Sequence, residues 1–265
     1  MRSRGFTLVE LIATMVILGI ISVMTSKFIV NGFSFYVDAT NIQKISTTAN
    51  FVAEKMEKLI ENSVPNSIVI SETGKSITFV PIKGALGYTY IPKNPLSAFD
   101  NKPVLYAVTT AFDRSNIKKG AFVAFNNYGS NEEYYEVLDV TVNGNVTAVT
   151  IDAPSSKKFT PGSERGRLYF VDGQNRYITV KLEKSQLLEK SQLLEKSQLV
   201  IIEHNGNEAT GTKNILARDV SDIRFSKVAG AFNQYGEIEI EYRFPYQNIA
   251  YEKSIYQRIG VANAP

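Results

Sequence analysis

The single histidine of this sequence, His204, is the first candidate for chemistry near neutral pH, where an imidazole can exchange a proton. A zinc site needs several nitrogen or sulfur ligands, yet the 265 residues include one histidine and no cysteine. A serine nucleophile would be expected in a context such as Gly-x-Ser-x-Gly, which the sequence lacks. The segment Glu203-His204-Asn205-Gly206 is typical of a solvated turn. We therefore expect no enzyme activity.

A group of carboxylates is the second candidate site. Glu132, Glu133 and Glu136 lie close together in the sequence, and hard cations such as Ca²⁺ prefer oxygen ligands. Their spacing is not that of an EF-hand loop, and a solvated charged surface is the favoured interpretation. The sequence thus predicts no metal and no cofactor. These three carboxylates are the candidate ligands if a metal ion is bound. The net charge of +3 is scattered along the chain, so no basic stripe indicates nucleic-acid binding.

An acidic residue at the start of an apolar segment is the third candidate. Glu10 stands directly before residues 11–26, which include no charged side chain. A carboxylate costs ~2.5–3.5 kcal/mol at the centre of a membrane helix and less near its end. Such a residue indicates a function and requires a partner that neutralises its charge.

The surrounding segment has the length and charge of a membrane anchor. Residues 6–30 form about 25 helical positions, roughly 37 Å, which exceeds the ~30 Å hydrocarbon core of a bilayer. Arg2 and Arg4 precede this run and favour a cytoplasmic N-terminus. No small-residue cleavage site follows the run, which favours a helix that is kept rather than removed.

A cut before the apolar run would supply the partner of Glu10. If the chain is cleaved between Gly5 and Phe6, a new α-amine appears four residues before Glu10. This amine can neutralise the carboxylate within one subunit or between neighbours staggered by about one helical turn. The attraction of such a pair at intermediate dielectric is ~4 kcal/mol, enough to favour one packing register.

The segment Arg4-Gly5-Phe6-Thr7-Leu8-Val9-Glu10 resembles the processing motif of type IV prepilins and type II secretion pseudopilins. This resemblance implies cleavage after Gly5 by an inner-membrane prepilin peptidase, N-methylation of Phe6, and pairing of Glu10 with the amine of an adjacent subunit. It implies other pilins, contacted through the N-terminal helix, and an inner-membrane assembly platform as partners. The precursor would be a single-pass protein of the bacterial inner membrane, later found in the periplasm or in an extracellular pilus.

The rest of the chain predicts an α+β, type IV pilin-like fold: a long N-terminal helix packed on antiparallel β-sheet. Residues 1–5 would be the leader, 6–30 the membrane and polymerisation helix, 31–63 its amphipathic continuation, and 64–265 a β-rich globular domain. The continuation has an apolar stripe with steps of three and four residues, and Pro65 cannot continue the helix. Residues 84–103, rich in Gly and Pro, are expected to be irregular. The predicted strands are residues 67–70, 76–81, 104–110, 121–125, 134–142, 146–151, 167–171, 176–181, 222–226 and 237–244.

A hexapeptide, Leu-Glu-Lys-Ser-Gln-Leu, occurs three times in succession over residues 182–199. Removing two copies leaves an ordinary hairpin with a four-residue turn, so we interpret the other twelve residues as a duplicated hairpin tip that protrudes. Leu, Glu, Lys and Gln favour helix, which allows a locally helical tip. A tolerated expansion is favoured over a role as a sticky projection.

Several short pieces of the chain resemble the MshO-like minor pilins of the mannose-sensitive haemagglutinin (MSHA) system. They are residues 29–32, 64–67, 79–82, 167–173 and 261–265. The layout is also similar to type II secretion pseudopilin J and to the PilW assembly proteins. This resemblance implies a low-abundance subunit that initiates, caps or decorates an adhesive pilus. A secretion pseudopilin and a membrane-anchored glycan-binding module stay open as alternatives.

Overall fold

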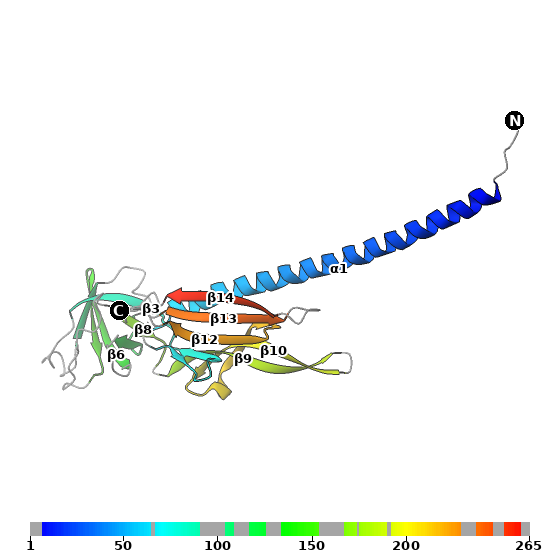
Figure 1. Ribbon diagram of the computed structural model, residues 1–265. Helices are drawn as coiled ribbons and strands as arrows, with labels where there is room; N and C mark the ends of the chain where they lie inside the picture. The colour runs from blue at the N-terminus through cyan, green and yellow to red at the C-terminus, as the bar shows by residue number, and fades with distance from the viewer. Residues whose placement is uncertain are drawn as a thin grey trace. The chain divides into compact units, whose positions relative to one another are not determined.

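One long helix and a set of antiparallel strands make up the computed structural model of the chain (Figure 1). The structure describes residues 7–64, 67–90, 104–108, 117–125, 134–153, 167–173, 175–189, 192–228, 237–245 and 252–260. The chain divides into two compact units, Met1–Thr48 and Ala49–Pro265. Residues 8–48 of the helix belong to the first unit, and residues 49–61 belong to the second.

The helix α1 runs from Leu8 to Glu61 without interruption and ends two residues before the predicted boundary at residue 63. The side chain of Asn62 donates a hydrogen bond to the carbonyl of Lys58 (2.8 Å), one of the carbonyls left without a helical partner at a C-terminus. The helix continues through Asn31 and Gly32, where the predicted membrane segment meets its amphipathic continuation.

The strands follow in chain order, with a short 3₁₀ helix before the eleventh. They are β1 (Val69–Ile70), β2 (Ser76–Phe79), β3 (Gly84–Tyr90), β4 (Val104–Val108), β5 (Phe122–Phe125), β6 (Tyr134–Asn143), β7 (Val146–Ile151), β8 (Arg167–Val171), β9 (Arg176–Glu189), β10 (Gln192–Asn205), η3 (Glu208–Thr210), β11 (Thr212–Arg218), β12 (Asp222–Val228), β13 (Glu237–Pro245) and β14 (Glu252–Gly260).

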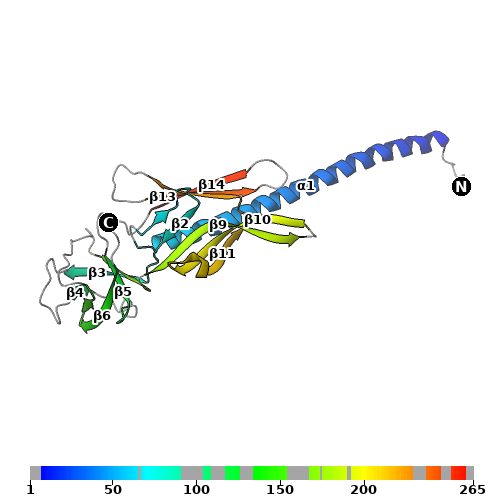
Figure 2. The ribbon, with the colours of Figure 1, turned by 90° about the horizontal axis from the view of Figure 1, so that it is seen from below.

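Two antiparallel sheets and a barrel contain these strands (Figures 1 and 2). The first sheet has the order β1-β2-β9-β10-β11, and the second has the order β12-β13-β14. The strands β3, β4, β7, β6, β5 and β8 close into a barrel in that order. The predicted α+β class, a long helix with antiparallel sheet, is therefore confirmed.

The barrel is inserted between two neighbouring strands of the first sheet. Phe79 of β2 pairs with Ile178 of β9, while all six barrel strands lie between these residues in the sequence. At the point of insertion the backbone N–H of Lys83 donates to the carbonyl of Phe170 (2.8 Å), which holds the outgoing and returning chains together. The expectation of irregular structure was wrong for residues 84–90, which form a barrel strand. The rest of that predicted segment, residues 91–103, lies outside the described residues.

The strands β9 and β10, which contain the hexapeptide repeat, extend beyond their sheet as a two-stranded ribbon (Figures 1 and 2). The neighbour β2 pairs with β9 only as far as Lys181, and β11 pairs with β10 only from Gln198 onward. The expected helical tip was wrong, because both described arms are strands.

Buried side chains of α1, of the sheets and of the barrel form the cores. The last turns of α1 contribute Val52, Met56 and Ile60, none of which has exposed surface. Antiparallel sheets supply apolar residues on alternate positions, as β13 does with its alternating buried and exposed residues. A separate core fills the barrel with Ile117, Val123, Tyr135, Val137, Val149, Ile151, Ala153, Leu168 and Phe170.

Candidate functional site

The first turn of α1 holds Glu10 in a reciprocal pair of hydrogen bonds with Thr7. The Thr7 backbone N–H and hydroxyl donate to Glu10 Oε2 at 3.1 and 2.9 Å. The Glu10 backbone N–H donates to Thr7 Oγ1 at 3.3 Å. This is the capping-box arrangement, in which two side chains satisfy donors that a helix N-terminus would otherwise leave without partners. An acidic group in the first turn also interacts favourably with the helix dipole.

Sequence reasoning missed Thr7, although the signal was present. Thr7-x-x-Glu10 directly before an apolar run is the pattern of a capping box. Glu10 therefore has a local partner within its own helix as well as the predicted α-amine. Gly5 and Phe6, the predicted cleavage and methylation residues, lie outside the described residues, as do Arg2 and Arg4. Their roles stay predictions.

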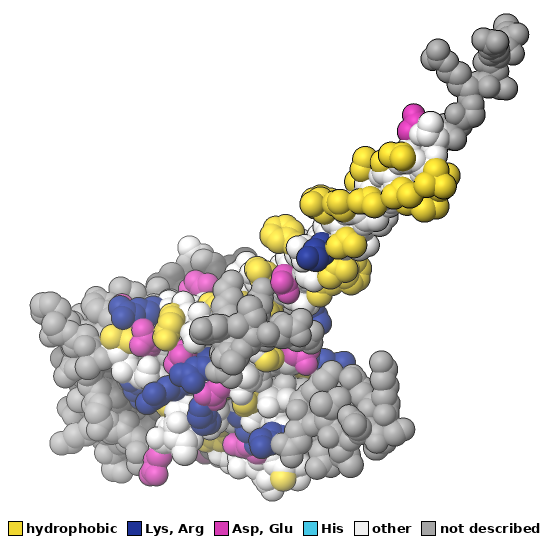
Figure 3. Space-filling model, turned by 45° about the vertical axis from the view of Figure 1, so that its right-hand side comes forward, with side chains coloured by type: hydrophobic (Ala, Val, Ile, Leu, Met, Phe, Trp, Pro, Cys, Tyr) yellow, Lys and Arg dark blue, Asp and Glu magenta, His cyan; other side chains and the backbone are white. Residues whose placement is uncertain are grey.

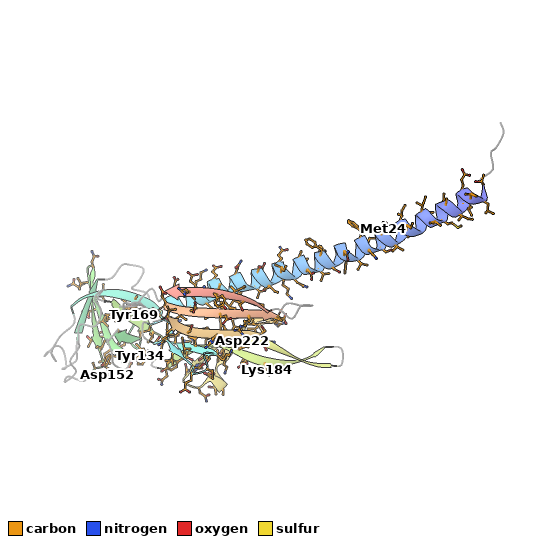
Figure 4. All side chains as sticks on the ribbon, in the orientation of Figure 1. Met24, Tyr134, Asp152, Tyr169, Lys184 and Asp222 are labelled. Carbon is orange, nitrogen blue, oxygen red and sulfur yellow. The ribbon has the colours of Figure 1, made fainter. Side chains whose placement is uncertain are left out.

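The helix that follows Glu10 is apolar and exposed on all sides. Every residue from Thr7 to Tyr36 is exposed, including Phe28 (79%) and Phe33 (69%). Figure 3 shows hydrophobic side chains covering this stretch, and Figure 4, which labels Met24, shows side chains projecting all round the helix. The most apolar part has a mean hydropathy of 2.3 and is long enough to cross a membrane. Such a surface requires a lipid or protein environment.

The last turns of α1 have two different faces. Ala49, Val52, Met56 and Ile60 are buried, whereas Phe51 is 56% exposed. The exposed face also includes an i,i+4 ion pair, in which Lys58 donates to Glu54 (2.6 Å) and lowers the pKa of Glu54. Of the stripe that sequence predicted, Ala49, Val52 and Met56 are buried and Leu59 is half-buried, whereas its first member, Ile42, is exposed.

A partly buried relay of two hydrogen bonds links these last turns to the second sheet. Gln257 of β14 donates from Nε2 to the carbonyl of Ala53 (2.9 Å) and accepts at Oε1 from the Tyr242 hydroxyl (3.0 Å). Tyr242 of β13 has no exposed surface, and this burial raises the pKa of its hydroxyl. These hydrogen bonds fix the position of the final turns of α1 on the second sheet, because they are directional and an apolar contact is not.

The predicted acidic cluster is only partly described. Glu132 and Glu133 lie outside the described residues, and Glu136 is an exposed residue of β6. Within the described ranges, no group of three His, Asp or Glu side chains is placed to hold a metal ion. The three carboxylates therefore gain no support as a metal site from the part of the chain that is described.

The interpretation of His204 as a solvated turn residue was wrong. His204 lies in β10, is 7% exposed, and stacks on Tyr177 with ring centroids 5.8 Å apart. Its Nε2 shares a hydrogen bond with Thr179 Oγ1 (2.9 Å), which in turn lies 2.8 Å from Thr78 Oγ1. The misleading signal was Asn205-Gly206, which does end the strand but only after His204. His204 thus has a structural environment in the sheet.

A shallow polar pocket of about 330 Å³ adjoins His204. Arg176 bridges two carboxylates there, bonding to Asp172 and lying 3.6 Å from Glu203. Lys83 Nζ also lies 3.5 Å from Asp172 Oδ2, so two cations balance the two carboxylates within the protein. The pocket is lined by Asp172, Arg176, Glu203, His204, Asn205, Thr210 and Thr212.

Comparison with known proteins places one family model on the chain. Residues 1–26 match the prokaryotic N-terminal methylation motif, which covers the cleavage motif and most of the exposed apolar helix. No curated protein and no solved structure is detectably similar to the chain. The matched motif and the apolar helix that it enters, which is long enough to span a membrane, support a type IV pilin-like protein with a membrane-anchored precursor.

Proposed function

We propose that this chain is a low-abundance subunit of a type IV pilus of the MSHA kind, where it initiates, caps or decorates an adhesive filament. The observation that carries the proposal is the exposed apolar half of α1, most of which lies within the matched N-terminal methylation motif, residues 1–26. The MSHA assignment is supported by the short segments that resemble MshO-like minor pilins. It is independent of the N-terminal motif, which supports only a pilin-like protein.

The mechanism is polymer assembly, without a catalytic step. Prepilin peptidase would cut after Gly5 and a methyl group would be added to Phe6, so that the new α-amine comes close to the first turn. Glu10 then has two competing partners, its own Thr7 and the amine of a neighbouring subunit. Transfer of Glu10 from the Thr7 cap to a neighbour's amine would replace neutral donors by a charged one, which gives a stronger hydrogen bond.

Assembly would also remove the apolar surface of α1 from the bilayer without exposing it to water. Apolar area is worth roughly 25 cal/mol per Å² when it is removed from water. Helices that leave the membrane must therefore contact one another along residues such as Phe28 and Phe33, which are exposed in the single chain. The assembly platform of the inner membrane would supply the work of extraction.

Fractionation of cells that express the full chain tests this proposal. A pilus subunit should be recovered, in its processed form, in filaments sheared from the cell surface. Recovery of processed protein only in the periplasm and inner membrane would instead support a pseudopilin of a secretion system. Unprocessed protein in the membrane that binds glycans when purified in detergent would support the anchored binding module.

A further inference from the structure

One basic residue interrupts the exposed apolar part of α1. Lys27 is exposed and stands between residues 11–26 and residues 28–37, and neither stretch includes a charged side chain. No acidic residue lies within four positions of Lys27, so an i,i+4 ion pair cannot neutralise its ammonium group. Lys27 therefore needs water or a partner outside its own helix.

The apolar part of α1 that contains Lys27 is longer than a bilayer is thick. Residues 11–37 would extend for roughly 40 Å at 1.5 Å per residue, against ~30 Å of hydrocarbon. Placing all of this length in the hydrocarbon would require a tilt of roughly 40°, the upper end of the range seen for membrane helices. With a smaller tilt, one end of the stretch lies outside the hydrocarbon.

The charge of Lys27 decides which end lies outside. A span over residues 7–26 is about 30 Å long and leaves Lys27 at the surface of the bilayer. A span of the same length that ends at residue 37 would begin at residue 18, leave Leu11 in water and put Lys27 at the bilayer centre. A cation at the centre is costly, whereas a lysine at the end of the span reaches the headgroups with its flexible side chain.

The aromatic side chains of α1 begin at the same level. Residues 8–27 include no aromatic residue, and Phe28 and Phe33 are the first exposed rings after Lys27. At about 100° per residue, these two rings lie roughly 100° and 240° from Lys27 around the helix, so the three side chains encircle it. The headgroup layer is about 5–7 Å thick, and long side chains of a helix point back toward its N-terminus, which brings both rings toward this layer.

We propose that Lys27, Phe28 and Phe33 form a collar that binds the phospholipid headgroups of the periplasmic leaflet. Lys27 pairs with lipid phosphate, and the two rings lie at the boundary between headgroups and acyl chains. The collar sets the depth of the chain in the bilayer, so the hydrocarbon span ends near residue 26, short of the predicted boundary at residue 30. This contact rests on the membrane-anchored precursor and does not depend on filament assembly.

Two spin labels placed symmetrically about Lys27 test the depth, because the chain has no cysteine of its own. Ile20→Cys and Ser34→Cys each lie seven residues from Lys27. The full chain is reconstituted in nanodiscs of phosphatidylethanolamine and phosphatidylglycerol. Collisions with oxygen should dominate at residue 20, about 10 Å inside the hydrocarbon, and collisions with a water-soluble nickel chelate should dominate at residue 34. Equal depths would place Lys27 at the bilayer centre and overturn the proposal.

Three substitutions in the Ser34→Cys chain test whether the cation holds this depth. Lys27→Leu leaves residues 11–37 without a charge and should move the label at residue 34 inward by about one helical turn, ~5 Å. Lys27→Arg keeps the cation, and Lys44→Leu removes a cation outside the collar, so both should leave the label where it is. An unchanged depth in Lys27→Leu would refute the role of Lys27.

Solid-state nuclear magnetic resonance of the same nanodiscs, in phosphate-free buffer, identifies the ligand of Lys27. With isotope label on the lysine side chains, no labelled residue precedes Lys27 and the next is Lys44. The phosphorus of the lipids should dephase a lysine Nζ signal, and Lys27→Arg should remove that dephasing. Absence of dephasing in the unsubstituted chain, or equal dephasing in Lys27→Arg, would contradict the phosphate contact. A chain that cannot enter filaments should give the same results, so these tests are separate from that of the pilus subunit.

Discussion

The two faces of the last turns of α1 predict opposite results for two alanine substitutions five residues apart. Met56 has no exposed surface, so Met56→Ala removes buried atoms and leaves a cavity, at a cost of about 2–5 kcal/mol. Phe51 is larger but 56% exposed, so Phe51→Ala should change the free energy of unfolding by no more than about 0.5 kcal/mol. Side-chain size alone would give the reverse order.

Urea unfolding of the full chain in detergent measures the difference. The chain has no tryptophan, and the buried Tyr242 gives a near-ultraviolet circular dichroism signal that reports on the folded core. With a denaturant slope of about 3 kcal/mol/M, Met56→Ala should lower the urea midpoint by roughly 1 M. Similar midpoints for the two variants, or a larger loss for Phe51→Ala, would show that the assignment of buried and exposed faces is incorrect.

Three further changes test other parts of the second unit. A Cβ at Gly211 would lie 2.6 Å from Ile202 Cγ2 and 2.7 Å from the Glu203 carbonyl, so Gly211→Ala should cost about 1–3 kcal/mol in thermal or urea unfolding. Arg243 donates to Glu241 (2.9 Å) and lowers the pKa of that carboxyl, so the stabilisation is complete above the unfolded value of about 4.3 and is lost as pH falls through the lower folded pKa. Glu241→Gln should therefore flatten the loss of stability between about pH 5 and pH 3, measured as urea midpoints. Deletion of residues 182–193 should leave the base of the ribbon folded, with an unfolding midpoint unchanged outside error, because Lys181 would still meet Val200 as it does now.

The elements that sequence predicted well are those with local signals. The long apolar run with no proline before Pro65 predicted α1, and alternation with turn residues predicted β7 within its observed bounds. The strand β11, which pairs with β10, was not predicted. The strands β3 and β14 were also missed, because glycine in β3 and charged residues in β14 weaken the local pattern. They are strands because β8 and β13 supply their hydrogen-bond partners from distant positions in the chain. Closure of the barrel is a long-range property of this kind.

The residues of the candidate site also divide into those with a local sequence signal and those whose environment depends on distant parts of the chain. The spacing of Glu10 from Gly5 is part of a sequence motif and could be predicted. The Thr7 cap could be predicted only by recognising the Thr-x-x-Glu pattern and the start of the helix at the same place. His204 was misjudged because the turn signal lies on the residues that follow it. Its burial depends on Tyr177 and Thr179, which belong to the opposite strand.

The identity of the mature N-terminus tests the central claim most directly. Mass spectrometry of the protein extracted from membranes and sheared filaments should find a chain that starts at methylated Phe6. A Glu10→Ala variant should be processed in the same way and yet be missing from the filaments, since it has lost the carboxylate that pairs with the neighbour's amine. An intact Met1, or a Glu10→Ala variant that enters filaments normally, would contradict the account and leave only a membrane-anchored domain.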